Sequence, residues 1–231
     1  MKRFYKTVTA VPAGEDFEIH LDGKPIRTPG RALLTVPTQA LADTIVEEWD
    51  AVKENVEPHM MPVTGIAYTA IDYMPAHRGE VVDAVAKYAE TDLVCYRAEG
   101  PRKLQEMHAN AFDPMVEWLE ERFGVRMAVT QGVIPVTQDP AHLAAIREVI
   151  DGIDDLRLAA LREIATITGS AAITLALWDN AIDPDMAWSV AQVDEDYHIG
   201  MWGEDPQAAI ARQARRRAMM AATKVLSSLT R

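Results

Sequence analysis

The chain has 231 residues, of which 48% are hydrophobic and 25% are charged, and its formal net charge is −12. This composition is ordinary for a folded protein with a substantial core, and it excludes global disorder. The negative charge argues against binding to nucleic acid and against stable attachment to a membrane, because both need cationic surface. A partner with a basic or amphipathic surface fits better.

A single cysteine, Cys95, leaves no disulfide possible within the chain. This cysteine usage is compatible with a reducing compartment, so we expect a cytoplasmic protein and interpret Cys95 as a small buried apolar residue rather than a reactive thiol. Residues 2–6 are basic but precede no apolar run, so no secretory signal is expected. The longest weakly charged run, residues 164–178, is shorter than a membrane span and indicates a buried helix.

Residues 3–36 carry the pattern of a small antiparallel sheet or meander. Apolar and polar residues alternate over residues 17–21, and Asp22-Gly23 is a strong signal for a two-residue hairpin. A further turn is expected at Pro29-Gly30 before residues 33–36 resume the strand pattern.

A helix should start after Thr38, which is a suitable N-cap, and run until Pro58 ends it. Its apolar positions recur at three- and four-residue spacing: Leu41, Ile45, Trp49, Val52 and Val56. Trp49 is therefore expected on a buried stripe. A short second helix is expected over residues 64–73, closed before Pro75.

The pattern beyond Pro75 becomes almost wholly helical. One stripe joins Leu104, Met107, Ala111, Met115, Trp118 and Leu119. Further helices are expected over residues 140–150, 156–169, 170–178, 184–199 and 206–229. The sequence therefore predicts an α+β chain with a β-rich N-terminal domain over residues 1–72, ending in a helix, and a larger helical domain over residues 73–231.

Four Asp-Pro pairs each precede a segment with helical periodicity. An N-cap aspartate accepts hydrogen bonds from free N–H groups, and proline at the first helical position lacks a donor that would be unpaired there anyway. We therefore interpret all four aspartates as helix caps rather than functional acids: Asp113, Asp139, Asp183 and Asp205.

Charge is segregated near the C-terminal end. Residues 163–211 contain no lysine or arginine but carry nine acids, and four arginines follow within residues 212–217. The acids concentrate at Asp194-Glu195-Asp196, next to Tyr197 and shortly before Trp202-Gly203. This acidic segment is the strongest candidate for function.

Helical geometry assigns faces to the expected helix over residues 184–199. With about 100° per residue, Met186, Val190, Val193 and Tyr197 share a face that should pack inward, whereas Trp188, Glu195 and Ile199 share another. Apolar anchors beside an acid are typical of a partner-binding site. The alternative is a bundle that buries this helix on two sides.

Trp202 either packs two helices together, which is the role we favour, or extends an exposed patch. The predicted partner-binding set is therefore Asp194, Glu195, Trp188, Ile199 and Trp202, with Trp49 as a structural residue.

Signals for enzyme chemistry are weak. The six histidines show no zinc-ligand spacing, and Asp194 with His198 is better explained as an exposed ion pair than as two metal ligands. Gly23-Lys24 belongs to a hairpin and not to a phosphate-binding loop, and no nucleophile-elbow motif is present. We expect no enzyme activity, no cofactor and no bound metal.

With these residues in view, the chain resembles the ATP synthase assembly chaperones of the ATP-twelve type, which occur in mitochondria and alphaproteobacteria and receive the unassembled alpha subunit of the catalytic head. The resemblance covers nearly the whole chain and departs from the family pattern at Val52, His108, Phe112 and His198. It rests on these motifs, in order: Arg3-Phe4-Tyr5-Lys6, Leu21-Asp22-Gly23-Lys24 with Thr28-Pro29, Glu48-Trp49-Asp50, Met61-Pro62-Val63-Thr64, Thr69-Ala70-Ile71-Asp72, Asp92-Leu93-Val94-Cys95-Tyr96-Arg97, Asp113-Pro114, and Val193-Asp194-Glu195-Asp196-Tyr197 with Trp202-Gly203-Glu204-Asp205.

This resemblance implies an ATP-independent chaperone that binds the free alpha subunit as a monomer and prevents its aggregation until the beta subunit replaces it. The family's important acid corresponds to Asp194 or Glu195, and its important tryptophan to Trp49. Two other classes compete with this interpretation. One is a metal- or small-molecule-binding enzyme with a pocket among the acidic helices, and the other is a structural subunit of a stable complex.

Overall fold

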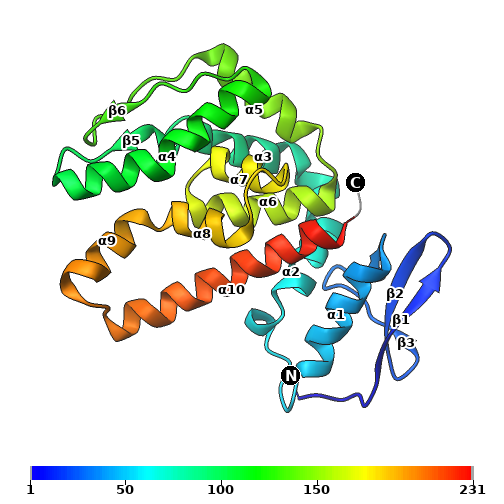
Figure 1. Ribbon diagram of the computed structural model, residues 1–231. Helices are drawn as coiled ribbons and strands as arrows, with labels where there is room; N and C mark the ends of the chain where they lie inside the picture. Colours follow the sequence, from blue (N-terminus) through cyan, green and yellow to red (C-terminus); the bar gives the residue numbers. More distant parts are fainter. Residues whose placement is uncertain (1, 230–231) are drawn as a thin grey trace. The chain divides into compact units, whose positions relative to one another are not determined.

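The computed structural model describes residues 2–229. Strands gather near the N-terminal end and helices make up most of the remaining chain (Figure 1), so the predicted α+β class is confirmed. The chain forms two compact units: unit 1 comprises Met1–Arg78, Asp154–Ala160 and Ala221–Arg231, and unit 2 comprises Gly79–Ile153 and Leu161–Met220. The division at residues 72 and 73 into separately folding domains stays a prediction.

Unit 1 contains a small antiparallel sheet whose central strand is β2. The strands are β1 (Val8–Ala13), β2 (Asp16–Leu21), β3 (Lys24–Pro25) and β4 (Thr35–Val36), and β2 pairs with all three others. The predicted hairpin at Asp22-Gly23 is confirmed, with φ values of 49° and 77° that suit a tight two-residue turn. Asp22 also accepts hydrogen bonds from the backbone N–H groups of Lys6 and Thr7, which lower the pKa of its carboxyl.

Helix α1 (Gln39–Ala51) covers the sheet and begins at the predicted cap, because the Thr38 hydroxyl accepts from the N–H of Leu41. Leu41, Ile45 and Trp49 are buried as predicted. The predicted extension toward Pro58 is wrong, since Val52 is already extended (ψ 119°). The Arg3 guanidinium donates to the carbonyls of Asp50 and Val52, so these groups are satisfied without a further helical turn.

The second helix starts earlier and ends later than predicted. Helix α2 (Pro62–Tyr68), a π-helical segment (Thr69–Tyr73) and α3 (Met74–Ala86) form one continuous helical run through Pro75. The wider π turn accommodates a proline that would otherwise end the helix. Glu48 of α1 accepts from the N–H groups of Val63 and Thr64, which caps α2 from a neighbouring helix. Unit 1 also contains the short 3₁₀ turn η1 (Pro58–Met60).

Unit 2 is a helical assembly with one short pair of parallel strands. Helix α7 lies at its centre and is buried from Ala171 to Leu177, as predicted for this apolar run. Besides the second part of α3, the elements are η3 (Lys87–Ala89), η4 (Leu93–Cys95), β5 (Tyr96–Arg97), α4 (Arg102–Phe123), β6 (Thr130–Gln131), α5 (Pro140–Asp151), α6 (Asp155–Thr168), α7 (Ala171–Trp178), α8 (Pro184–Ala191), α9 (Val193–Trp202) and α10 (Pro206–Ser228). Two of them, α6 and α10, contribute residues to both units.

Three of the four predicted Asp-Pro caps are confirmed, and one is wrong. Asp139, Asp183 and Asp205 accept from N–H groups at the starts of α5, α8 and α10. Asp113, however, lies inside the 22-residue helix α4, and its carboxylate pairs with Arg97. Pro114 is tolerated there because the helix buries a continuous stripe on both sides of it, consisting of Leu104, His108, Phe112, Met115 and Leu119.

That buried stripe differs from the predicted one. His108 and Phe112 occupy the inner face, while Met107, Ala111 and Trp118 are only half-buried. Cys95 is buried as expected, and burial raises the pKa of its thiol to about 12. No helix within residues 2–229 is long and apolar enough to cross a membrane.

Candidate partner-binding surface

The acidic segment does not continue one long helix. The predicted helix over residues 184–199 is broken at Gln192 (φ −111°, ψ 13°), which ends α8 and starts α9. Val193 is buried and fixes the start of α9, so Asp194, Glu195 and Asp196 fall in the first turn. Carboxylates are favourable there because the helix N-terminus carries partial positive charge.

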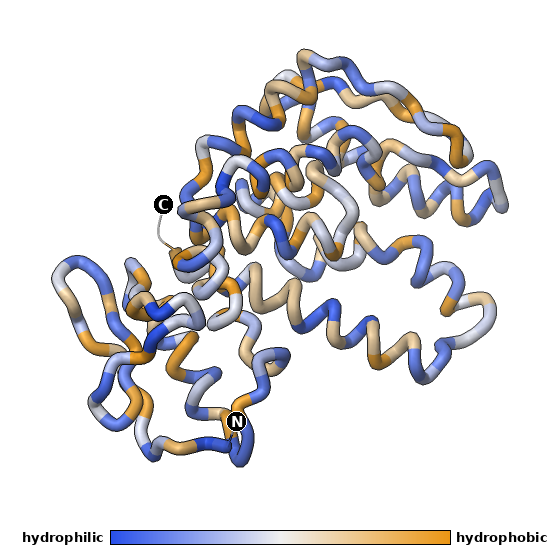
Figure 2. Tube along the Cα trace, turned by 180° about the vertical axis from the view of Figure 1, so that it is seen from behind, coloured by the Kyte–Doolittle hydropathy of each residue, from blue (hydrophilic) through white to orange (hydrophobic). Residues whose placement is uncertain are grey.

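The arginines that follow in the sequence fold back on these acids. Arg215 donates to Glu195 (2.7 Å) and Arg212 donates to Asp196, while Arg216 pairs with Asp185 of α8 (2.8 Å). Helix α10 thus pairs with Asp185, Glu195 and Asp196 of the negative block that the sequence segregates. The hydropathy trace in Figure 2 shows hydrophilic and apolar residues alternating along α10, which is the pattern of a helix packed on one face.

Asp194 is the exception among the three acids, because its partner is a histidine. The Nε2 atom of His108 lies 3.0 Å from Asp194 Oδ1, and the backbone N–H of Ala98 donates to Nδ1 (3.1 Å). Since Nδ1 accepts, it carries no proton, and the imidazole is neutral with its proton on Nε2. The Asp194 side chain is 48% exposed, so its charge stays uncompensated and accessible.

This arrangement corrects the expected ion pair between Asp194 and His198. The imidazole of His198 instead lies against the ring of Trp202, with 5.1 Å between ring centroids. The buried His108 is the partner that sequence reasoning missed, because helix α4 lies more than 80 residues away in the chain (a separation of 86).

The predicted exposure of Trp188 is also wrong. Its side chain is buried, with 6% of its surface accessible, and the Arg212 guanidinium lies 5.8 Å from its ring centroid. The break at Gln192 changes the helical phase, so Trp188 no longer shares a face with Glu195 and Ile199. Met186, predicted to pack inward, is 52% exposed, so that prediction is wrong.

Exposed apolar side chains cluster where α9 meets α10. Trp202 is 75% exposed, so the favoured core-packing role is wrong, and Ile210 and Met201 are exposed as well. Gly203 (φ 83°) ends α9 and lets the chain turn into α10. A hollow of about 360 Å³ beside them is lined by Trp188, Glu204, Ile210 and Arg212, among others. We call the set Asp194, Glu195, Ile199, Met201, Trp202 and Ile210 the α9–α10 surface.

Trp49 lies in unit 1 and has a different environment. It is 5% exposed, its ring packs against that of Tyr5 (5.7 Å between centroids), and the Tyr5 hydroxyl donates to its carbonyl. This burial is what the predicted structural role of Trp49 requires. Among residues 2–229, no three His, Cys, Asp or Glu side chains are grouped closely enough to hold a metal ion.

Comparisons with known proteins give a consistent result. A family model described as ATP12 chaperone protein matches residues 2–120. The mitochondrial protein atp12 of Schizosaccharomyces pombe is 24% identical over 215 residues, covering 87% of this chain and 74% of the relative.

Solved structures agree over almost the full length. The crystal structure of Atp12 from Paracoccus denitrificans is 34% identical with a TM-score of 0.90, covering 98% of this chain and 97% of that one. A crystal structure of a candidate chaperone from Agrobacterium tumefaciens is 38% identical with a TM-score of 0.94, covering 99% of this chain and 86% of that one.

Proposed function

Because the chain belongs to the ATP12 chaperone protein family and is therefore an ATP synthase assembly chaperone, we propose that its client is the unassembled alpha subunit of the catalytic head. The chaperone holds this subunit through the α9–α10 surface and prevents its aggregation until the beta subunit takes its place. It acts as a monomer in the bacterial cytoplasm, without a cofactor and without turnover of a substrate.

One observation carries this proposal: α9 and the start of α10 carry both an uncompensated carboxylate and large exposed apolar side chains. Asp194 is half exposed and paired only with a neutral imidazole, whereas Trp202 and Ile210 present large apolar groups to solvent. Exposed aromatic anchors beside a charge are typical of protein-binding sites. A client with a basic and apolar surface matches this combination.

The predicted site residues take different roles in this proposal. Asp194, Ile199 and Trp202 contact the client directly. Glu195 also belongs to the surface, but its carboxylate is held by Arg215, so a client cation has to compete with that arginine. Trp188 is buried against Arg212, so its role is to support the α9–α10 surface by packing.

Charge reversal at Asp194 tests the proposal. The variant Asp194→Lys should weaken capture of the co-expressed alpha subunit by about tenfold, because the new lysine repels the basic client surface that the Asp194 carboxylate attracts. Asp185→Lys is the matched control, since Asp185 is more exposed (78%) and already paired with Arg216. Affinity is measured by pull-down and by the soluble fraction of the alpha subunit. Equal capture by both variants would reject this surface.

The apolar part is tested separately. Trp202→Ala removes an exposed side chain, so it should lower capture without lowering the melting temperature. Ile134→Ala is the matched control, because Ile134 is exposed to the same degree (76%) in a loop of unit 2. An equal loss in both variants would mean that exposed hydrophobicity in general, rather than the α9–α10 surface, holds the client.

A further inference from the structure

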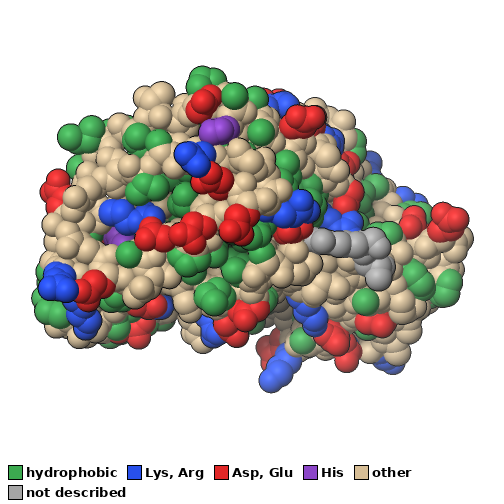
Figure 3. Space-filling model, turned by 45° about the horizontal axis from the view of Figure 1, so that its top comes forward, with side chains coloured by type: hydrophobic (Ala, Val, Ile, Leu, Met, Phe, Trp, Pro, Cys, Tyr) green, Lys and Arg blue, Asp and Glu red, His purple; other side chains and the backbone are tan. Residues whose placement is uncertain are grey.

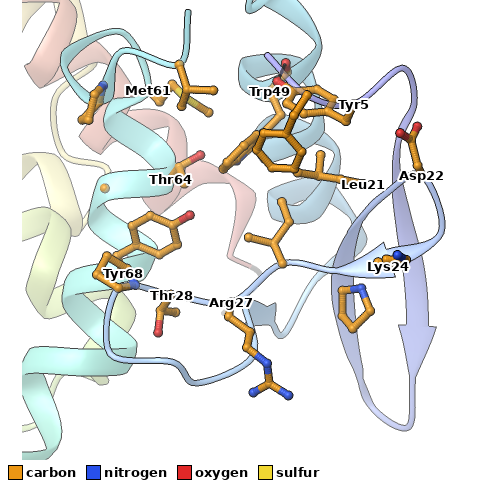
Figure 4. A pocket seen from close by; sticks show the side chains of 17 residues that line it. Tyr5, Leu21, Asp22, Lys24, Arg27, Thr28, Trp49, Met61, Thr64 and Tyr68 are labelled. Carbon is orange, nitrogen blue, oxygen red and sulfur yellow. Dashed lines mark hydrogen bonds between the residues drawn. The ribbon is translucent and has the colours of Figure 1, made fainter. Parts of the chain in front are cut away.

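Unit 1 contains a pocket that the proposed function does not use. It has a volume of about 730 Å³ and lies between the N-terminal segment, the β2–β3 hairpin with the loop that follows, α1 and α2. Figure 4 shows Trp49 on α1, Thr64 and Tyr68 on α2, and Leu21 on the hairpin side. We call it the Trp49 pocket. Its volume falls within the range of about 300–1,000 Å³ that is typical of ligand sites.

Most of its wall is apolar. Leu21, Ile26, Trp49 and Met61 are buried side chains that line it, and Phe4, which is 64% exposed, lies at its edge. An exposed phenylalanine beside a concave apolar wall offers area for one large apolar side chain.

The polar groups that line the pocket differ in whether they already have a hydrogen-bond or ion-pair partner. The Asp22 carboxylate already accepts from Lys6, Thr7 and the Thr7 hydroxyl, and the Thr64 hydroxyl donates to Glu48. In contrast, Lys24 has no ion-pair partner within residues 2–229, and Arg27 donates only to the carbonyl of Arg31. The carboxylate of Asp22 is therefore already engaged in hydrogen bonds, whereas the positive charges of Lys24 and Arg27 are not neutralised by a carboxylate within residues 2–229.

Tyr68 adds a neutral donor. Figure 4 shows its hydroxyl directed into the pocket, and it has no hydrogen-bond partner in the described part of the chain. Burial, with a smaller contribution from Asp72, raises the pKa of Tyr68 to about 12. The hydroxyl therefore keeps its proton and can donate at any physiological pH.

We propose that the Trp49 pocket binds an extended peptide segment that inserts one large apolar side chain and presents a carboxylate to Lys24 and Arg27. The complementarity is one of charge and hydrogen bonding: unpaired cations and a donor on the protein meet an anion and carbonyl acceptors on the peptide. The inference rests on the proposed function for the source of this peptide, which is the alpha subunit. It adds a second, concave contact of opposite polarity to the α9–α10 surface.

The pocket is tested with designed peptides, whose binding does not depend on the identity of the client. The probe is a fluorescent nine-residue peptide with one phenylalanine followed by two aspartates between glycine and serine spacers, and binding is followed by fluorescence polarisation. Replacing the aspartates with lysines, or the phenylalanine with alanine, should weaken binding about tenfold. Lys24→Glu with Arg27→Glu should weaken it similarly, and added salt should reduce the difference.

A variant that fills the pocket tests whether the peptide enters it, because such a variant changes no charge. Gly65 lines the pocket within α2, and a side chain added there meets nothing within 4 Å. Gly65→Leu therefore enters open space, keeps the helix and should abolish binding. Gly79→Leu is the matched control, because Gly79 is also helical with open space around it and does not line the pocket.

Each outcome decides a separate point. Binding of the designed peptide that is lost in Gly65→Leu and retained in Gly79→Leu supports the inference. Binding that is unchanged in Gly65→Leu, or equal for aspartate and lysine peptides, overturns it. Competition by decanoate as strong as by the peptide would also overturn it, because the pocket would then be a site for free carboxylates. If designed peptides bind but overlapping peptides covering the alpha subunit do not, only the proposed source is overturned.

Discussion

The Trp49 pocket and the α9–α10 surface differ in how their charges are paired. On the α9–α10 surface, Glu195 is paired with Arg215 of the same unit, whereas Asp194 meets only the neutral His108 and keeps its charge. At the Trp49 pocket, Lys24 and Arg27 have no carboxylate partner within residues 2–229. On the face shown in Figure 3, acidic and basic side chains are interspersed.

The difference suggests two kinds of contact. The Glu195–Arg215 pair must open before a client can use that carboxylate, whereas Asp194 and the cations of the Trp49 pocket are available from the start. A surface with paired charges discriminates between clients, and a pocket with unpaired charges attracts one. The predictions below test this contrast, from the largest expected effect to the smallest.

Removing the tryptophan side chain should have the largest effect. Trp49→Ala should lower the free energy of unfolding by about 3–5 kcal/mol, because it leaves a cavity under α1. Trp49→Phe should cost much less, because the buried Trp49 Nε1 has no hydrogen-bond partner within residues 2–229 and the substitution therefore breaks no bond. Urea unfolding followed by circular dichroism measures both variants. A cost below about 1 kcal/mol for Trp49→Ala would show that the ring serves the pocket and not the fold.

Asp92 provides an intermediate effect in unit 2. It is fully buried and accepts from the N–H groups of Val94 and Ala172, and burial raises the pKa of its carboxyl to about 6, from an ordinary 3.8. Between these values the folded chain keeps a proton that the unfolded chain releases. The contribution of Asp92 to stability is therefore greatest below about pH 4 and is lost, by up to about 3 kcal/mol, as the pH rises from about 4 through 6.

The variant Asp92→Asn isolates this contribution, because asparagine does not titrate. The difference in unfolding free energy between the wild type and Asp92→Asn should shift in favour of the variant between pH 4 and pH 7. Urea titrations at several pH values measure it, and other carboxylates cancel in the difference. A difference that stays constant with pH would contradict the assignment.

Local chemistry explains what the sequence could predict. The hairpin at Asp22-Gly23 and the caps at Thr38, Asp139 and Asp183 depend on neighbouring residues, and the structure confirms each of them. The α+β class follows from the change of apolar periodicity along the chain. These features need no knowledge of tertiary contacts.

The errors come from contacts between distant residues. Periodicity could not show that Gln192 breaks the acidic helix, so it placed Trp188 on the wrong face. It also could not show that Asp194 meets His108, because the two residues lie far apart in the sequence. The Trp49 pocket is equally non-local, because four separate segments form it.

The smallest expected effect concerns the ion pair between Glu195 and Arg215. Both side chains are partly exposed, 31% and 41%, so their coupling energy should be below about 1 kcal/mol and should decrease further at high salt. A double-mutant cycle with Glu195→Gln and Arg215→Gln, read by urea unfolding, measures it. A coupling above about 2 kcal/mol would mean that the pair is a fixed part of the fold. A weak coupling means that a cation on a client can replace Arg215 at little cost, and the acids of α9 then remain available for binding although they are paired in the free protein.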